Sequence, residues 1–306
     1  MNTVPTPRPD EGVVSFNVNT ACNYRCSYCT QRFKEDRGRW AKDTPRFLAA
    51  FSRLRDVSGR WEIKLSGGEP FVHPTLLELV RGLAELGHRI SIVTNFSPKL
   101  ERIVAFLDAA QGRVGIFSAS LHLEYVDDEA ALAAFIDKAR ATQQGMGERH
   151  CDPSLPRPSF CVTAVATRPL LPRLPALRER FEAEGLVFKV QPEKQDRDVI
   201  AYTPEEEAAL LALGGHNLTQ QIVHRYRGLP CWAGARYFIL DDEGIAYRCY
   251  PARRYRLERM GNFLDETFRL EDGPKPCLYA TCNCTVPIGR RMMPQKEPSL
   301  EVHDLP

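Results

Sequence analysis

Short apolar segments alternate with helical patterns along the first two thirds of the chain. The expected strands are 13–19, 61–66, 89–95, 114–120, 160–167 and 186–191. Each is short, apolar and separated from the next by a helical pattern. Strands joined by helices pair in parallel through right-handed crossovers. Six such units predict an α/β fold, either an incomplete barrel or an open doubly wound sheet.

Turn and capping residues set the expected helix boundaries. Thr44 and Pro45 begin the first helix as its N-cap and first-turn residue. The Pro- and Gly-rich stretch 145–159 is expected to be a loop. A capping box that starts at Thr203 begins the last regular helix. The other helices are expected at 74–87, after Ser97-Pro98, at about 127–142 and from Leu174 to Gly185.

Composition argues against several classes of function. The 306 residues include 41 Lys and Arg and 39 Asp and Glu, so the formal net charge is 41 − 39 = +2. That balance argues against a protein that grips nucleic acid through its phosphates. No apolar run approaches the ~20 residues of a membrane-spanning helix, and the polar N-terminus lacks a secretory h-region. We therefore expect a cytoplasmic protein that binds neither nucleic acid nor a membrane.

Three of the ten cysteines stand close together directly after the first expected strand. Cys22, Cys26 and Cys29 have the spacing C-x3-C-x2-C within TACNYRCSYCT. Clustered thiols in a chain of this length, with nothing targeting it to an oxidising compartment, indicate metal binding or catalysis. A structural zinc takes four protein ligands, whereas three thiolates on a [4Fe–4S] cluster leave one iron open. The spacing favours the cluster; a zinc knuckle completed by a distant residue is the alternative.

The loop resembles the signature of the radical S-adenosylmethionine (radical SAM) superfamily, C-x3-C-x-(aromatic)-C, with Tyr28 at the aromatic position. A second family element, LSGGEP, follows the second expected strand and contains Ser66, Gly67, Gly68, Glu69 and Pro70. Two glycines let the backbone approach a ligand closely, and the Glu69 carboxylate with nearby backbone groups can hold an ammonium group. The resemblance implies a partial (β/α)6 TIM-like barrel as the core domain over residues 1–215.

The resemblance also implies a mechanism. Cys22, Cys26 and Cys29 bind three irons, and the amino and carboxylate groups of S-adenosylmethionine chelate the fourth. An electron splits the sulfonium into methionine and a 5′-deoxyadenosyl radical, which removes a hydrogen atom from the substrate. The cofactor carries the chemistry, while the protein positions the reactants and excludes water. An external electron donor such as flavodoxin or ferredoxin is implied.

Polar residues near the carboxyl ends of the later strands are candidate contacts. The resemblance places ribose or carboxylate contacts among Thr94, Asn95, Ser118, Ser120 and His122, and adenine contacts through the backbone at Val165 and Thr167. Gln191 and Glu193, at the end of the sixth strand and just past it, are the candidate catalytic residues that face the substrate. Polar residues at strand ends also cap the following turn, which is the alternative for each of them.

A second group of cysteines lies near the C-terminus. Cys231, Gly244 and Cys249 resemble the C-x(9–15)-G-x4-C opening of SPASM and twitch auxiliary-cluster domains. The segment predicts a β-hairpin that turns at DDEG. The further cysteines are Cys277, Cys282 and Cys284, so five thiols follow residue 230. Full SPASM domains carry seven, and five suit one auxiliary [4Fe–4S] cluster in a small domain over 216–306; which four bind is open, and a zinc-stabilised tail is the alternative.

Several readings of function follow from these motifs. The resemblance implies an enzyme that oxidises or rearranges a small biosynthetic metabolite with help from the auxiliary cluster. About a dozen residues precede the first strand, so the expected lack of a leader-recognition module favours a small molecule over a peptide substrate. A peptide-modifying maturase that cross-links or epimerises a precursor is the alternative, and a zinc-binding interaction protein is a remote one.

The C-terminal part is also rich in arginine. Pairs stand at 253–254 and 290–291, with Arg248 and Arg256 nearby. These side chains could attract an acidic substrate. Arginines of this kind more often only solvate a surface, which is the interpretation that we favour from the sequence.

Overall fold

Nine strands of the computed structural model form one sheet, in the order β12-β11-β10-β1-β2-β3-β4-β5-β6. The structure describes residues 12–31, 33–150, 152–195, 198–213, 226–280, 282 and 285–294. Strands β1 to β6 pair with their neighbours in chain order, all in parallel. They are β1 (Gly12–Asn19), β2 (Trp61–Gly67), β3 (Arg89–Thr94), β4 (Val114–Leu121), β5 (Ser159–Ala166) and β6 (Val187–Pro192). The six predicted strands and the α/β partial barrel are therefore confirmed.

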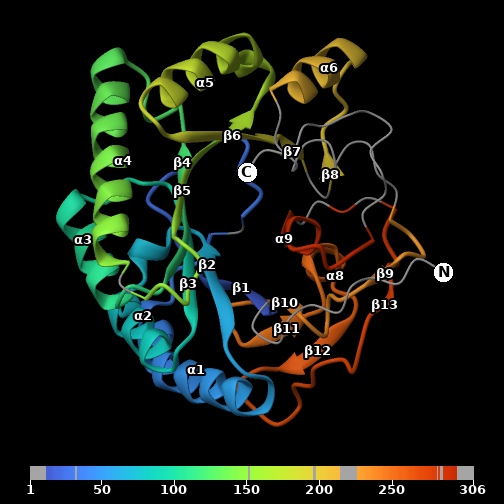
Figure 1. Ribbon diagram of the computed structural model, residues 1–306. Helices are drawn as coiled ribbons and strands as arrows, with labels where there is room; N and C mark the ends of the chain where they lie inside the picture. Colours follow the sequence, from blue (N-terminus) through green and yellow to red (C-terminus); the bar gives the residue numbers. More distant parts are fainter. Residues whose placement is uncertain are drawn as a thin grey trace.

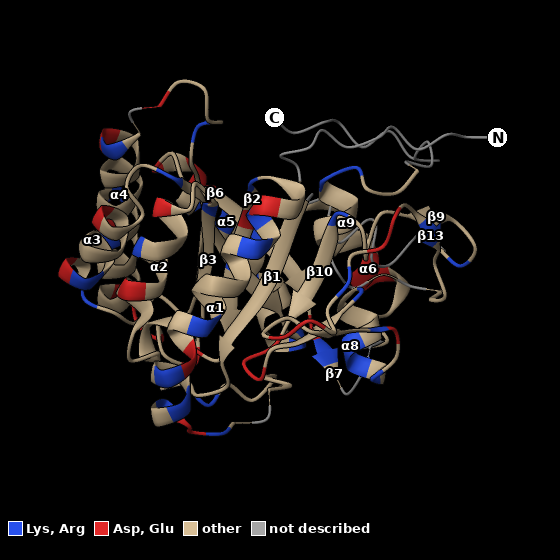
Figure 2. Cartoon of the chain, turned by 90° about the horizontal axis from the view of Figure 1, so that it is seen from below, with Lys and Arg blue, Asp and Glu red and all other residues tan. Residues whose placement is uncertain are grey.

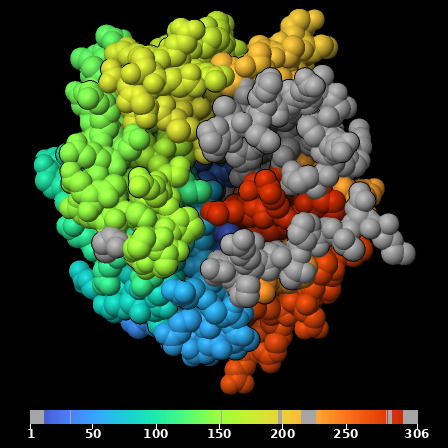
Figure 3. Space-filling model, in the orientation of Figure 1, coloured from blue at the N-terminus to red at the C-terminus, as the bar shows by residue number. Residues whose placement is uncertain are grey.

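Helices connect these strands and cover the outside of the sheet (Figure 1). Figure 3 shows the colours following one another around the molecule from the blue of α1 to the yellow of α5, with the C-terminal segments on the remaining side. The helices are α1 (Arg37–Ser58), α2 (Leu76–Glu85), α3 (Leu100–Ala109), α4 (Glu129–Arg149), α5 (Leu174–Ala183) and α6 (Pro204–Ala212), with short 3₁₀ turns η1 (Pro70–Val72) and η2 (Arg168–Arg173). None of the helices in the described ranges is long and apolar enough to cross a membrane.

Three helix boundaries differ from the prediction. Helix α1 begins at Arg37, capped by Asp36, so Pro45 lies inside it and Thr44 bonds back to the Trp40 carbonyl at 3.0 Å. Helix α4 continues through Gly145 to Arg149, because Met146 is buried and Arg149 pairs with Asp108 at 2.7 Å. Helix α3 begins after Lys99, without a side-chain cap from Ser97. The capping box at Thr203 is confirmed.

The C-terminal segments extend the same sheet. Strand β10 (Tyr237–Leu240) pairs in parallel with β1, and β11 (Ile245–Tyr247) returns beside it as the predicted hairpin. The further elements are β7 (Lys194–Gln195), β8 (Asp198–Val199), β9 (Pro230–Cys231), α8 (Tyr250–Tyr255), β12 (Arg259–Asn262), β13 (Lys275–Pro276) and α9 (Thr285–Gly289). The division into two domains at residue 215 stays a prediction.

Two apolar clusters lie on opposite faces of β1. Val14, Phe16 and Val18 belong to the large core beneath the helices, whereas Val13 belongs to a smaller cluster with the C-terminal segments. Successive residues of a strand point to opposite faces, so one strand contributes to both. The smaller cluster contains four of the cysteines, discussed below.

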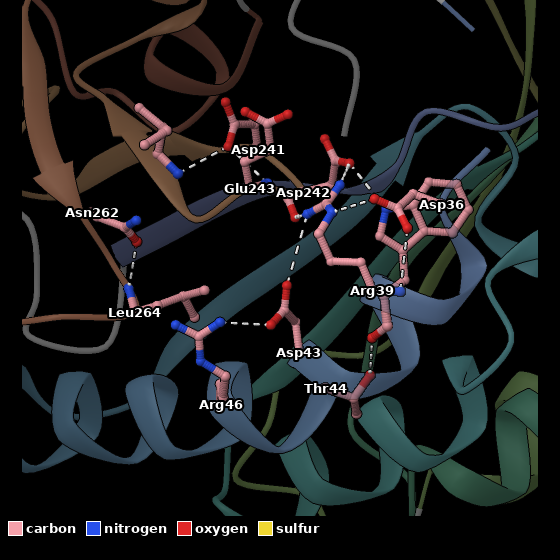
Figure 4. Close-up of polar contacts among 12 residues, drawn as sticks. Asp36, Arg39, Asp43, Thr44, Arg46, Asp241, Asp242, Glu243, Asn262 and Leu264 are labelled. Carbon is pink, nitrogen blue, oxygen red and sulfur yellow. Dashed lines mark hydrogen bonds and ion pairs between the residues drawn. The ribbon is translucent and has the colours of Figure 1, made fainter. Parts of the chain in front are cut away.

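An ion-pair network joins α1 to the β10–β11 turn (Figure 4). The Arg39 guanidinium pairs with the Asp242 carboxylate at 2.6 Å, and the Trp40 indole donates to the same oxygen at 3.0 Å. Asp36 holds Arg39 from the other side at 2.8 Å. The first turns of α1, which the sequence pattern did not predict, are thus tied to the C-terminal hairpin.

Candidate active site

The three-cysteine loop leaves the carboxyl end of β1. Cys22 and Cys26 are half-buried and Cys29 is exposed. The backbone N–H of Tyr24 donates to Cys22 Sγ at 3.4 Å, and that of Cys29 donates to the Cys26 carbonyl at 3.0 Å. Burial raises the pKa of Cys26 to about 11, and the neighbouring Cys29 and Cys22 add to the rise. The thiols thus share one loop at the end of the sheet where parallel α/β folds carry their sites.

The segment after β4 holds this loop in place. The rings of Tyr24 and Tyr125 stack at 3.7 Å, and the backbone N–H of Arg25 donates to the Tyr125 hydroxyl at 2.6 Å. The Ser27 N–H donates to the Glu124 carboxylate at 3.0 Å. Sequence reasoning missed Tyr24, Glu124 and Tyr125; the aromatic between two of the cysteines was the available signal for the first.

His122, predicted as a cofactor contact, faces the cysteine loop directly. Its Nδ1 lies 2.7 Å from the Tyr28 hydroxyl and 3.3 Å from Cys26 Sγ. Burial lowers the pKa of His122 to about 4, only partly offset by Glu124. The ring is therefore neutral at pH 7, and it fixes the orientation of the aromatic residue of the motif.

The glycine pair after β2 packs against the start of the cysteine loop. The Gly68 N–H donates to the Asn19 carbonyl at 3.0 Å, and the Glu69 N–H donates to the Ala21 carbonyl at 2.7 Å. A Cβ on Gly68 would overlap the Ala21 carbonyl oxygen. Gly67 has a φ of 130°, a conformation that favours glycine. The two glycines therefore let the two backbones approach each other, in addition to any approach to a ligand.

Glu69 is buried, and its carboxylate accepts three hydrogen bonds from the protein. The donors are the Phe71 N–H at 3.0 Å, the Thr94 hydroxyl at 2.7 Å and the Asn95 N–H at 2.6 Å. Burial raises the pKa of Glu69 to about 7, although each of these donors lowers it. A carboxylate offers about four acceptor sites, so most of its capacity is used internally. Contact with a cofactor ammonium group stays a prediction.

The other predicted cofactor residues divide into two groups. Asn95 donates to Asn23 Oδ1 at 2.8 Å and lies 3.7 Å from Cys22 Sγ, so it supports the cysteine loop. Thr94 is buried on Glu69. Ser66 bonds the Asn17 amide at 2.9 Å, Ser118 lies 3.2 Å from Thr163 Oγ1, Ser120 is half-buried on the same strand, and Pro70 begins η1.

Two cavities open beside the cysteine loop. The larger, of about 1530 Å³, lies between the loop and the C-terminal hairpin with α8, and Tyr28, Cys29 and Glu193 are among its lining residues. The smaller, of about 640 Å³, lies at the ends of β4 to β6 and is lined in part by Val165 and Thr167. Tyr28 lines both. The predicted adenine contacts thus border a cavity that reaches the cysteine motif.

The two candidate catalytic residues lie differently. Glu193 lines both cavities, and its backbone N–H donates to the Tyr202 hydroxyl at 2.7 Å. Gln191 lies on β6, paired with Val165, and is half-buried. It lines neither cavity.

Four C-terminal cysteines gather around one apolar cluster. Cys231, Cys249 and Cys282 are buried in it, and Cys277 packs against it. Cys284 and Cys151 lie outside the described residues. Cys161 is buried in β5, as predicted for a core residue.

Arg248 organises the segments that carry these cysteines. Its buried guanidinium donates to the carbonyls of Ala233 at 2.8 Å and Lys275 at 2.6 Å, and it pairs with Glu258 at 2.7 Å. It reaches the carbonyls of Cys231 and Pro276 as well. The interpretation of Arg248 as a surface residue is therefore wrong: five backbone and carboxylate acceptors compensate its burial.

The donor set of the first loop fits an iron–sulfur cluster in its chemistry. Three cysteines that form no disulfide stand on one loop, and thiolates are the ligands that such clusters take. Within the described ranges, no three cysteine, histidine or acidic side chains are grouped closely enough to hold a metal ion as they stand. Binding a cluster would therefore require the loop to bring its thiols closer together.

Comparison with known proteins identifies the class. Residues 16–149, which contain the three-cysteine loop and the Gly-Gly-Glu turn, match the family model described as the Radical SAM superfamily. The chain belongs to the radical SAM superfamily and is an enzyme of this class, which uses a [4Fe–4S] cluster with S-adenosylmethionine.

Individual relatives match only part of the chain. A stretch of 117 residues, 36% of this chain, is 31% identical to the GTP 3',8-cyclase of Listeria monocytogenes serotype 4b and covers 34% of it. Another of 82 residues is 36% identical to the probable GTP 3',8-cyclase of Saccharolobus islandicus and covers 26% of it. The chain thus spans at most about a third of the length of these curated relatives.

Solved structures share the fold at low sequence identity. Streptococcus suis SuiB bound to S-adenosylmethionine superposes with a TM-score of 0.57 at 14% identity, over 83% of this chain and 63% of that one. The enzyme anSMEcpe with bound AdoMet gives 0.54 at 15% identity, over 83% and 78%. These similarities confirm the fold.

Proposed function

We propose that Cys22, Cys26 and Cys29 hold the [4Fe–4S] cluster on which this enzyme binds S-adenosylmethionine. The observation that carries the proposal is the packing of the thiol loop against the Gly67-Gly68 turn, at the point where two cavities meet. When bound, such a cluster supplies the electron for reductive cleavage of S-adenosylmethionine. The smaller cavity then holds the adenosine, and the larger one holds the substrate.

The chain's own residues position the loop and shape this space. Asn95 supports Cys22, and the neutral His122 orients Tyr28 beside Cys26. Glu193 lines both proposed compartments, so its carboxylate is placed to hold or move a proton near the substrate. We propose no such role for Gln191.

We further propose that Cys231, Cys249, Cys277 and Cys282 hold one auxiliary [4Fe–4S] cluster. These four thiols come from separate segments, and both the apolar cluster and the hydrogen bonds of Arg248 draw those segments together. Burial raises the pKa of Cys277, and Arg248 lowers it. A thiolate ligand needs such a compensating cation when it is buried.

The reaction that we propose is the oxidation or rearrangement of a small metabolite. The names of the matching curated proteins, GTP 3',8-cyclase, support a small molecule over a peptide. A cytoplasmic location and an external electron donor such as flavodoxin or ferredoxin belong to the same proposal.

Iron analysis of cysteine variants tests the assignment. Protein purified without oxygen should bind about eight irons per chain and absorb broadly near about 400 nm. Cys231→Ala should bind about four and still form 5′-deoxyadenosine from S-adenosylmethionine after reduction, whereas Cys26→Ala should form none. Cys161→Ala, a buried cysteine outside both sets, is the matched control. Stoichiometric zinc in a colourless protein would contradict the proposal.

A further inference from the structure

The larger cavity carries an arginine cluster at its C-terminal wall. Helix α8 contributes Arg253 and Arg254, and Arg256 and Arg259 follow from the segment behind it. Figure 2 shows these basic residues on α8 close to the basic β7. Lys194 of β7 lies over the Tyr250 ring at 5.4 Å and lines the same cavity. The wall that faces the cysteine loop across this space is therefore basic.

Arg254 has no hydrogen-bond partner for its charge. Both terminal nitrogens of its guanidinium are buried, and neither meets an acceptor in the structure. Burial of an unpaired guanidinium is strongly unfavourable, and almost all buried polar groups are paired. Arg254 lines the cavity, so an anion that enters this space can supply the acceptors that the protein does not.

Arg253 is anchored to the barrel strands. With the Asn17 amide oriented so that its oxygen faces the guanidinium, Arg253 Nη2 donates to it at 2.8 Å, and Nη1 donates to it as well. The same amide then donates to Ser66 at 2.9 Å. Asn17 and Ser66 face each other on β1 and β2. The arginine pair is thereby fixed relative to the strands that carry the cysteine loop and the Gly-Gly-Glu turn.

Two of the acidic residues on the cavity wall are committed elsewhere. Asp242 pairs with Arg39 and the Trp40 indole. Asp241 accepts from the N–H groups of Glu243 and Ile245, at 3.0 and 2.9 Å, within its own turn. The carboxylates that remain on the lining are those of Glu193 and Glu243. They face four arginines and two lysines, Lys34 and Lys194, so the cavity favours an anion.

We propose that Arg254, with Arg253 beside it, binds a phosphate or carboxylate group of the substrate in the larger cavity. A guanidinium offers a planar fork of donors that matches either group. This inference rests on the proposed function, because it takes the cavity beside the cysteine loop as the substrate compartment. It replaces the interpretation that these arginines only solvate a surface.

Titration calorimetry on the anaerobically reconstituted enzyme tests the proposal. The probes are pyrophosphate and succinate at low ionic strength. We expect the wild type to bind one of them, Arg254→Gln to bind it at least about tenfold more weakly, and Arg254→Lys to recover part of the loss. The matched control is Arg81→Gln, which makes the same charge change on the exposed face of α2 and should bind as the wild type does.

The two anions separate the sources of the acidic group. Tighter binding of pyrophosphate assigns a phosphate, and tighter binding of succinate assigns a carboxylate. Failure of both anions to bind the wild type, or equal affinities of Arg254→Gln and Arg81→Gln, would overturn the proposal. Iron content and 5′-deoxyadenosine formation, measured on the same samples, report on the proposed function separately. A folded Arg254→Gln that retains both therefore isolates the anion site.

Discussion

The backbone N–H of Asn95 donates a hydrogen bond of 2.6 Å to the carboxylate of Glu69. The side chain of Asn95 continues from there to Asn23 at 2.8 Å and to the sulfur of Cys22 at 3.7 Å. The end of β3, the Gly-Gly-Glu turn and the cysteine loop are thus one connected unit. A change in the Glu69 carboxylate should therefore be felt at the first thiol.

Substitution of Glu69 should change how stability depends on pH. Because burial raises the pKa of Glu69 to about 7, the folded state keeps this proton to a higher pH than the unfolded state does. The free energy of unfolding of the metal-free wild type, relative to Glu69→Gln, should fall by about 3 kcal/mol as pH rises from about 4.5 to about 7. Urea denaturation across this range measures it, and parallel profiles of the two proteins would refute the buried carboxylate.

Gly68→Ala should damage the cysteine loop. The added Cβ meets the backbone carbonyl of Ala21, which cannot turn aside as a flexible side chain could. We expect a loss of at least about 1–3 kcal/mol of stability and of iron bound by Cys22, Cys26 and Cys29. Gly147→Ala in α4 is the control, because its Cβ meets nothing within 4 Å. Denaturation and iron analysis decide the matter, and equal behaviour of the two variants would show that the close approach is unimportant.

Arg248→Met should disorganise the C-terminal cysteine cluster. It leaves the carbonyls of Ala233 and Lys275 without their donor and Glu258 without its cation. Removal of one partner of a buried ion pair lowers stability by about 3–5 kcal/mol. Iron content should fall from about eight to about four per chain. Arg81→Met, at an exposed site, should keep both properties; a full iron complement in Arg248→Met would contradict the assigned role.

Arg39 and Asp242 should be energetically coupled. Their side chains are 30% and 10% exposed, so solvent screens the pair only partly. A double-mutant cycle with Arg39→Met and Asp242→Asn should give a coupling energy of about 0.5–3 kcal/mol. Chemical denaturation of the four proteins measures it. A coupling energy of zero would mean that α1 and the hairpin turn are not joined by this contact.

The six barrel strands were predictable because short apolar segments and helical patterns are local signals. The start of α1 was not, since its first turns depend on Asp36, and on contacts of Arg39 and Trp40 with Asp242, about two hundred residues away. The glycines of α4 likewise read as a loop, because the burial of Met146 that holds the helix is a tertiary effect.

The candidate site was predictable where it is a sequence motif and not where it depends on packing. Cys22, Cys26, Cys29 and the Gly-Gly-Glu turn stand on contiguous segments. The support from Tyr125 and Glu124 comes from another loop without a local signal. The role of Arg248 was missed because its five acceptors come from segments that meet only in the folded chain.

The most direct test of the central claim is pulsed electron–nuclear double resonance on the reduced protein with S-adenosylmethionine labelled with ¹⁵N at its amino group. Three cysteines on a [4Fe–4S] cluster leave one iron for this group, so we predict a hyperfine coupling to ¹⁵N that disappears in Cys26→Ala. A wild-type protein that binds its iron and shows no such coupling would contradict the account.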